Sequence, residues 1–567
     1  MNQHLSRHPL FLSLLPLLFT WLLLALAQPR ELQNDDLQIF FQYCNGGTGA
    51  IPFSFYSGYL TGLLLQGLNY LYDGLNWHLI LLQISGSLAC GGLNFFAVKR
   101  ILSTPSGSRN LDCVRLLSAL AFLLFFNYKC ILFAQYTYIG ILNACAALFL
   151  LYDWSLGTRG AFKYSFTVLL FICAFEMRNQ SIVPFFLLGL FVLWVIVTTS
   201  DKEAKKRFIR GGMIFPALLA ILLAIHTSAF NAEPAWQQAM QYNTARGMIH
   251  DSRDNSGVDK TPGLQQLGIS SQDYRIFKSF TYLPGFCEEK ADILEKVQEL
   301  HQDQRKGLFG LDFAAEHGLL ALGDYQYKEG STPAQSISPW LPLITALILV
   351  LVGVNRKCAA YAFPVLVALI VYFCLLFSME RVVGRVFHPV LYASAIWLFS
   401  APLSANALTK NKLICTGLLC LEIMAALFCL RDARHQFNQK EQPWKICAQN
   451  PQNLYLTTSM QHLCIYPPGW KGVSLRYFAT TNMLPIADGW CFYSPAYHAA
   501  LHARGIKNPY AEICKPNTFL ITQNDRNASE ILSYISAIHE KQMGTPLRFS
   551  ITETTDKFSF WKAEAAD

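Results

Sequence analysis

The sequence predicts an all-α polytopic membrane protein that ends in a small α/β domain. Three observations support this prediction. The 567 residues are 53% hydrophobic and only 14% charged. Apolar runs of about 20 residues, the length that a helix needs to cross a bilayer, recur as far as residue 430. Beyond that point short β-rich runs alternate with helical ones, which is typical of an α/β domain.

The apolar runs predict about 11 transmembrane helices. They cover residues 9–28, 77–98, 113–131, 135–152, 161–175, 180–199, 211–229, 339–354, 358–378, 388–408 and 413–430. With the N-terminus inside, every cytoplasmic loop is rich in Lys and Arg, as the positive-inside rule requires. These loops also account for the net charge of +8 without a nucleic-acid partner. The first run lacks a small-residue cleavage site, so we interpret it as a retained helix.

This topology divides the chain into four parts. Residues 1–229 form an N-terminal transmembrane module with a first outer loop at 29–76, and residues 230–338 form a large extracytoplasmic loop. Residues 339–430 supply the last transmembrane helices, and residues 431–567 form the extracytoplasmic α/β domain. The topology requires that Ser57–Leu71, a short stretch with three glycines, lies on the outer face instead of crossing.

Local signals predict elements inside the outer segments. Ser270-Ser271-Gln272-Asp273 resembles a capping box at the start of a helix, and Ala291–Lys306 has helical periodicity. In the tail, Ser494-Pro495 begins a short helix that Gly505 closes. The last predicted elements are two strands around one helix, at Thr518–Thr522, Ser529–Gln542 and Leu547–Thr552.

Four of the 16 cysteines lie in the tail, at Cys447, Cys464, Cys491 and Cys514. An even number of cysteines in an oxidising compartment predicts two disulfides, with three pairings open. The alternative is a set of buried free thiols, which behave as small apolar side chains.

Two adjacent carboxylates, Asp35 and Asp36, follow the first transmembrane helix by about one helical turn. A carboxylate held at the membrane surface can take a proton from an acceptor hydroxyl. The alternative is a pair of solvated charges at a helix end. Because lipid-linked donors present their head groups at this surface, we predict that one of the two is catalytic.

Several ionisable residues contradict the positive-inside rule, because they lie at the outer ends of predicted helices. They are Lys129, Glu176, Arg178, Glu380, Arg381 and Arg385. Such groups are costly unless they are paired or face a wet cavity. Arg381 and Arg385 are four residues apart, so on a helix they share one face and could grip a phosphate. Salt bridges to Glu176 and Glu380, or snorkelling at the interface, are the alternatives.

With these residues placed, the chain resembles the GT-C superfamily of polytopic glycosyltransferases, which use polyprenyl-phosphate sugars. Asn34-Asp35-Asp36 matches the acidic motif of the first outer loop in position, and Ser57–Trp77 resembles the surface-helix stretch that follows it. Gly384-Arg385 resembles an arginine near the lipid phosphate. Bacterial GT-C-like proteins resemble the chain further in the stretches around Trp236 and Asp488-Gly-Trp490.

The resemblance implies a polyprenyl-phosphate sugar lipid as donor and a glycan, lipid or protein of the cell envelope as acceptor. It places the chain in the bacterial cytoplasmic (inner) membrane, with its C-terminal domain outside. One departure matters: many members carry a second acidic motif where this chain reads Asn127-Tyr128-Lys129. That departure leaves the metal site unknown and a divalent cation open, and it makes Lys129 a further phosphate contact. Glu176 is an alternative carboxylate.

Four functions remain open at this point. The first is the glycosyltransferase, with Asp35 or Asp36 as base and Arg381, Arg385, Lys129 and Arg178 around the phosphate. The second is a surface-polysaccharide polymerase or ligase that uses a diphosphate-linked oligosaccharide. The third is a transporter or flippase, which the rim position of the charges disfavours. The fourth is a non-catalytic assembly or receptor protein. Trp236 either stacks on a sugar ring or packs the large loop.

Overall fold

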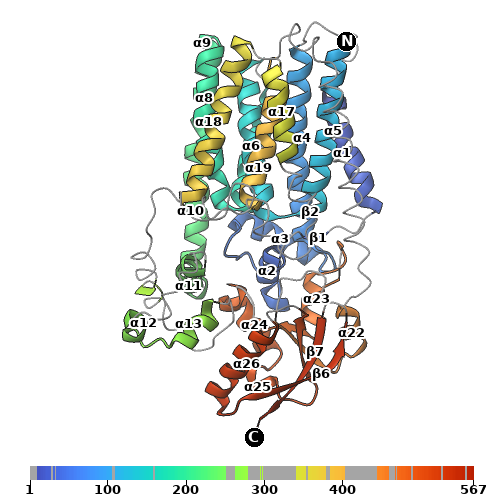
Figure 1. Ribbon diagram of the computed structural model, residues 1–567, viewed down its shortest axis with the longest axis vertical. Coiled ribbons are helices and arrows are strands. Elements are labelled where there is room, and N and C mark those ends of the chain that lie inside the picture. The colour runs from blue at the N-terminus through green and yellow to red at the C-terminus, as the bar shows by residue number, and fades with distance from the viewer. Residues whose placement is uncertain are drawn as a thin grey trace. The chain divides into compact units, whose positions relative to one another are not determined.

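Apolar helices dominate the part of the chain that the structure describes. The computed structural model describes residues 9–26, 30–31, 34–104, 109–157, 160–250, 262–278, 294, 296–297, 340–352, 355–378, 384–402, 443–458, 466–467, 469–486, 490–524, 528–555 and 558–566. Six helices in these ranges are long and apolar enough to cross a membrane. The chain folds into two compact units, which are described separately (Figure 1).

Unit 1 contains Met1–Pro29, Leu79–Ala224 and Gly307–Asn438. Ten of the eleven predicted spans coincide with a helix, and the eleventh, 413–430, lies outside the described residues. The ten helices are α1 (Pro9–Leu26), α4 (Trp77–Ser103), α5 (Arg109–Leu132), α6 (Tyr136–Leu156), α7 (Ala161–Met177), α8 (Val183–Thr199), α10 (Ile214–Asn231), α17 (Trp340–Val352), α18 (Arg356–Ser378) and α19 (Gly384–Phe399). Three short elements, β2 (Phe133–Ala134), η3 (Asn179–Ile182) and α9 (Lys202–Gly212), complete the described part of this unit.

Helix α6 is the centre of unit 1. Nearly all of its residues are buried, and it contacts α7, α8, α9 and α19. Helices α1, α8 and α18, by contrast, expose large apolar side chains such as Leu18, Leu190 and Ile370. Exposed leucine and isoleucine rows are expected on helices that face lipid, where no water opposes their exposure. The all-α membrane part of the prediction is therefore present in the fold.

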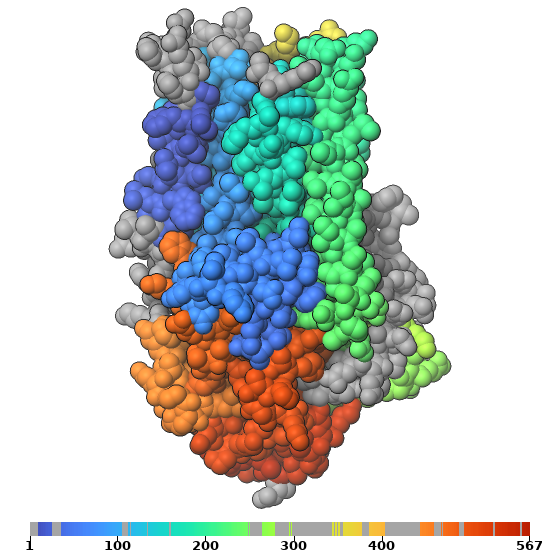
Figure 2. All heavy atoms as spheres, turned by 180° about the vertical axis from the view of Figure 1, so that it is seen from behind, coloured from blue at the N-terminus to red at the C-terminus, as the bar shows by residue number. Residues whose placement is uncertain are grey.

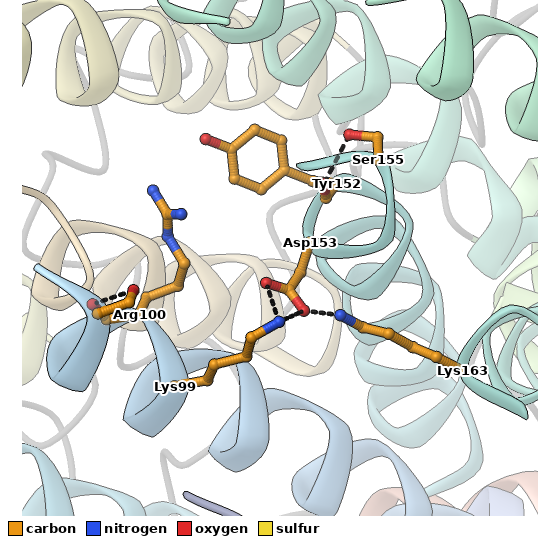
Figure 3. A network of polar contacts seen from close by, with 7 residues as sticks. Lys99, Arg100, Tyr152, Asp153, Ser155 and Lys163 are labelled. Carbon is orange, nitrogen blue, oxygen red and sulfur yellow. Dashed lines mark hydrogen bonds and ion pairs between the residues drawn. The ribbon is translucent and has the colours of Figure 1, made fainter. Parts of the chain in front are cut away.

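A buried carboxylate joins three helices of unit 1 (Figure 3). Asp153 of α6 is 3% exposed and forms ion pairs with Lys99 of α4, at 2.8 Å, and with Lys163 of α7. The neighbouring Arg100 guanidinium lies over the rings of Tyr152 and Tyr361, at 5.6 and 5.8 Å. One negative charge thus holds two ammonium groups from different helices at one end of the bundle.

Unit 2 contains Arg30–His78, Ile225–Lys306 and Gln439–Asp567, three segments far apart in the sequence. The first segment supplies β1 (Arg30–Glu31), α2 (Asn34–Tyr43), η2 (Asn45–Gly47) and α3 (Tyr59–Leu71), and the second supplies α11 (Pro234–His250), α12 (Pro262–Gln266) and α13 (Ser271–Lys278). The third supplies α22 (Pro443–Gln449), α23 (Leu475–Thr480), η7 (Trp490–Tyr493), α24 (Pro495–Ala503), α25 (Pro509–Glu512), α26 (Ala528–Met543) and five strands. Figure 2 shows the first and third segments of this unit packed side by side.

The five strands of the tail form one mixed sheet in the order β4-β3-β5-β7-β6. They are β3 (Leu454–Thr457), β4 (Met483–Pro485), β5 (Thr518–Gln523), β6 (Leu547–Thr554) and β7 (Phe558–Ala565). Strand β3 runs parallel to β4 and β5, whereas β7 is antiparallel to β5 and β6. Helix α26 leads from β5 to β6 and packs on β6, so the predicted strand–helix–strand order of the α/β tail is confirmed.

Two predicted helix starts are confirmed by their caps. Ser494 Oγ accepts the Tyr497 N–H at the start of α24, and Gly505 follows that helix with φ +68°, as predicted. Ser270 Oγ accepts the Asp273 N–H at the start of α13. The predicted helix Ala291–Lys306 lies largely outside the described residues.

Helix α3 does not belong to the membrane bundle. It lies in unit 2, as expected for a stretch that does not cross, and it exposes Leu63, Leu64, Tyr70 and Leu71. A helix with such an apolar face fits the interface between water and lipid.

Specific contacts join the three segments of unit 2. Asp73 accepts two hydrogen bonds from the Arg476 guanidinium, at 2.5 and 3.1 Å, and Arg476 holds the pKa of this carboxyl below its usual range. Lys541 of α26 pairs with Asp273 of α13 at 2.8 Å. The first segment also enters the tail at Gly46 and Gly47, where a Cβ would meet the backbone of α24 and α23.

We expect Gly47→Ala to lower the free energy of unfolding by about 2–4 kcal/mol. Gly47 has φ +98°, and a Cβ there would lie 2.5 Å from the carbonyl of Phe478, so backbone strain and a clash add together. Thermal denaturation of the purified chain measures the effect. The matched control is Gly67→Ala on α3, where a Cβ meets nothing within 4 Å. Equal melting temperatures for the two variants would contradict the prediction.

The two predicted disulfides are not seen among the residues that the structure describes. Cys447 and Cys514 form no disulfide there, and Cys464 lies outside the described residues. Cys447 and Cys491 are buried in the tail as small apolar side chains, and burial raises the pKa of the Cys447 thiol to about 12. Cys514 Sγ lies 3.7 Å from His539 Nε2.

Candidate functional site

Helix α2 carries the acidic pair of the first loop. Asp35 and Asp36 lie in its first turn, where carboxylates are favoured by the helix dipole. Asp36 is fully buried, at 0% exposed. The helix is fixed by its aromatic residues, because Phe40 and Phe41 both contact the ring of Phe478 from α23, at 6.0 and 5.2 Å between ring centroids. The tail therefore holds the helix that carries the predicted base.

The same helix buries amide side chains. Gln38 and Gln42, one turn apart, are both 0% exposed. Gln42 Oε1 accepts the Phe55 N–H at 3.1 Å, whereas neither amide atom of Gln38 has a hydrogen-bond partner in the described structure. An unsatisfied buried polar group costs about 1–3 kcal/mol, so this arrangement is not expected from stability alone.

A hydrogen-bonded chain leads from α2 to the second segment of unit 2. Next to Phe55, the Tyr56 hydroxyl exchanges hydrogen bonds with the amide of Asn243 on α11, at 3.1 and 3.4 Å. Asn243 Oδ1 in turn accepts from the buried Arg246 guanidinium, at 2.8 Å. Gln42 and the pair Asn243–Arg246 thus hold the same short segment, Phe55-Tyr56, from α2 and from the large loop.

In unit 1, two of the predicted outer-end residues lie near the ends of helices that pack against each other. Lys129 is in the last turn of α5, with its ammonium 5.4 Å from the ring centroid of Phe125, and Arg385 is in the first turn of α19. The two helices are packed together deeper in the bundle, where the rings of Phe126 and Tyr392 lie 5.1 Å apart.

Arg178 lies at the same end of unit 1, and its guanidinium donates hydrogen bonds to other residues of the protein. Its guanidinium donates to Tyr136 Oη, Thr137 Oγ1 and twice to Gln180 Oε1, which occupies four of its five N–H groups. These contacts tie η3 to the start of α6, and the role of Arg178 as a phosphate contact stays a prediction. Glu176, in the last turn of α7, is buried.

Arg381, with its neighbour Glu380, lies outside the described residues, so the expected pairing of Arg381 and Arg385 stays a prediction.

Trp236 does not offer a free face to a sugar. It is 5% exposed and stacks on Phe53 at 5.6 Å, with Phe55 and Phe230 against its other sides. Of the two interpretations, packing of the large loop is the correct one.

No group of three or more His, Cys, Asp or Glu side chains suited to a metal ion occurs in the described ranges. Where the family resemblance expects a second acidic motif, the chain has Asn127, whose buried amide has no hydrogen-bond partner in the described structure. A divalent cation at the site therefore stays an open prediction.

Sequence reasoning overlooked Gln38 and Gln42. A signal for the glutamines existed, since they recur with helical spacing among the apolar residues Leu37, Ile39, Phe40 and Phe41. A polar residue at a position that the pattern marks as buried is the more informative exception. Asn243 and Arg246 belong to the stretch around Trp236 that carries the family resemblance, which assigned them no role.

The chain was compared with protein families, curated proteins and solved structures. No protein-family model matches the chain, and no curated protein matches it. Among solved structures, the chain is similar to the crystal structure of ArnT from Cupriavidus metallidurans bound to undecaprenyl phosphate. That similarity covers 98% of this chain and 96% of ArnT, with 12% sequence identity and a TM-score of 0.32. At these values, the chain's own residues carry the proposal that follows.

Proposed function

We propose that the chain is an integral membrane glycosyltransferase, which moves a sugar from a polyprenyl-phosphate donor to an acceptor of the cell envelope on the extracytoplasmic face. The observation that carries this proposal is the setting of α2. A helix with a carboxylate pair in its first turn follows the first membrane helix and is held in a unit built from the three segments between and after the membrane helices. A solvated helix end would need no such support.

In the proposed reaction, Asp35 or Asp36 removes the proton of the acceptor hydroxyl. The acceptor oxygen then forms a bond to the anomeric carbon of the donor sugar, while the bond from that carbon to the phosphate oxygen breaks. The electron pair of the broken bond remains on the phosphate, so polyprenyl phosphate leaves with an added negative charge. Lys129 and Arg385 are the cations proposed to stabilise that charge. Inversion at the anomeric carbon is what the family resemblance implies.

We expect Arg385→Gln to weaken binding of the donor lipid about tenfold to hundredfold, the equivalent of one charge-assisted hydrogen bond. Native mass spectrometry of the purified chain, which counts retained polyprenyl-phosphate lipids, measures this loss. The matched control is Arg356→Gln, because Arg356 begins α18 and so lies at the other end of the bundle from Arg385. Equal lipid retention in both variants would remove Arg385 from the proposal.

The polysaccharide polymerase or ligase differs from this proposal in its donor. A deletion strain that accumulates a polyprenyl-phosphate monosaccharide supports the glycosyltransferase. Accumulation of a diphosphate-linked oligosaccharide in the same strain would instead support the polymerase, and unchanged envelope glycans and lipids would contradict both.

A further inference from the structure

Helix α9 is a short basic helix that packs on α6 and α8 in unit 1. Two carboxylates lie on it or at its start. Asp201 Oδ1 accepts the Ala204 N–H as the cap of the helix, and Glu203 pairs with Lys206 at 3.3 Å. Among the residues that the structure describes, the other cations of this helix form no ion pair. They are Lys202, Lys205, Arg207 and Arg210.

The inner face of α9 fixes the helix on its neighbours. Gly211 packs so closely that a Cβ there would lie 2.7 Å from the ring of Trp154 on α6. The Tyr164 hydroxyl of α7 donates to the Gly211 carbonyl at 2.7 Å, and Arg207 Nε donates to the Ser155 carbonyl of α6 at 2.8 Å. The outer face of α9 is therefore presented in one fixed orientation.

The outer face carries a basic stripe. Lys202, Lys206 and Arg210 recur every four residues, so they share one side of the helix, and all three are exposed. The exposed residues that follow, Met213 and Ile214, are apolar. On this side the helix thus changes from charged to apolar within one turn.

The length of the helix explains this change. Helix α9 leads directly into α10, and residues Lys202–Asn231 form a helix of 30 residues that is long and apolar enough to cross a membrane. Thirty helical residues measure about 45 Å, which is about the thickness of a bilayer with its head groups. The apolar part therefore matches the hydrocarbon, and the basic stripe matches the depth of the head groups.

A second group of cations adjoins α9. Lys163 directly precedes Tyr164, and its ammonium shares Asp153 with that of Lys99 (Figure 3). Two ammonium groups for one carboxylate leave an excess of positive charge. Phe162, on the other side of Lys163, is 85% exposed. The combination of excess positive charge and exposed apolar surface thus continues onto the start of α7.

These features select an anionic lipid as the partner. Exposed Lys and Arg at head-group depth attract phosphate, and each basic residue near a membrane surface strengthens this attraction about fivefold. A zwitterionic lipid gains less, because its own ammonium group opposes the protein's cations. A soluble acidic partner would leave Met213 and Ile214 uncovered, whereas the acyl chains of a lipid cover them.

We propose that Lys202, Lys206 and Arg210 form a binding surface for the head groups of anionic phospholipids. In the predicted topology this surface faces the cytoplasmic leaflet. The inference does not depend on the proposed glycosyl transfer. It also goes beyond the positive-inside rule, which requires only an excess of basic residues on one side and not a stripe in a fixed orientation.

The test replaces the stripe in the full-length chain by Lys202→Gln, Lys206→Gln and Arg210→Gln together. The proteins are purified into neutral detergent micelles that contain equal amounts of phosphatidylglycerol and phosphatidylcholine, and native mass spectrometry counts the retained lipids of each class. We expect the wild-type chain to prefer phosphatidylglycerol, and the triple variant to lose that preference about tenfold to hundredfold. Added salt should weaken the preference of the wild-type chain.

The matched control is Lys471→Gln, Lys507→Gln and Lys515→Gln in unit 2, which changes the net charge equally. These lysines are also exposed, and Lys515 pairs with Glu512 three residues away, as Lys206 does with Glu203. This variant should keep the wild-type preference. Equal losses in the two triple variants would show that net charge alone attracts the lipid, which overturns the inference.

Two milder variants decide the question if the triple variant of α9 folds poorly. Lys206→Gln alone removes an exposed pair that contributes little to stability, and it should lower the preference about fivefold. Lys202→Arg, Lys206→Arg and Arg210→Lys together keep every charge and should keep the preference. An unchanged preference in Lys206→Gln, or a lost one in the charge-preserving variant, would overturn the inference and leave the transferase proposal standing.

Discussion

Asp36→Asn or Asp35→Asn, made singly, is expected to lower sugar transfer about 10²–10⁴-fold, the usual contribution of a general base. Asparagine has the size of aspartate but cannot accept the proton of the acceptor hydroxyl. The variant that carries the loss identifies the base. The measurement is a profile of envelope glycans and lipids in a strain that lacks the chromosomal copy, with the polyprenyl-phosphate sugar quantified.

The control for this pair is Asp73→Asn. Asp73 belongs to the same segment of unit 2, but its side chain is exposed and pairs with Arg476. We expect normal transfer in this variant, because an exposed pair contributes little to stability and lies outside the proposed chemistry. Full activity in both Asp35→Asn and Asp36→Asn, at normal protein levels, would rule out base catalysis by the pair.

Asp153→Asn should lower the free energy of unfolding by about 3 kcal/mol. Removing this carboxylate would leave Lys99 and Lys163 close together without the negative charge that pairs with both, and breaking a buried ion pair costs about 3–5 kcal/mol. We expect the lower end of this range for Asp153→Asn, because Lys99 is 34% exposed and water can partly solvate its ammonium group. Thermal denaturation in detergent measures the change.

Two comparisons make that result specific. Lys99→Met keeps Asp153 paired with Lys163, so it should cost less than Asp153→Asn. Glu203→Gln removes the exposed partner of Lys206 and should change stability by less than about 1 kcal/mol. Equal losses for Asp153→Asn and Glu203→Gln would show that the buried carboxylate does not hold the helices.

Much of the fold could be predicted from the sequence because its signals are local. Ten of the predicted spans coincide with helices, because apolar length is a local signal, and the starts of α13 and α24 follow from Ser270 and Ser494 as caps. The errors concern residues whose role depends on distant segments. The tail cysteines would need specific three-dimensional proximity to form disulfides, and Trp236 is covered by Phe53 from a segment about 180 residues earlier.

For the candidate site too, the sequence predicts only those features that depend on local signals. The position of Asp35 and Asp36 after the first helix could be inferred from hydropathy, because topology alone gives their distance from the membrane. The contacts of Arg178 with Tyr136, Thr137 and Gln180 could not be inferred in this way, because they depend on how the helices pack. The unpaired amide of Gln38 could not be predicted either, because burial is a property of the packed structure.

The contact of Gly47 with Phe478 also determines when the first loop can mature during synthesis. The two residues are 431 positions apart (478 − 47), and a ribosome that adds about 5–20 residues each second needs about 20–90 s to bridge that distance. During this interval α2 lacks the ring of Phe478 against which Phe40 and Phe41 pack. The loop that carries the acidic pair is thus among the first segments to be translated and among the last to reach its folded form, which couples assembly of the site to completion of the chain.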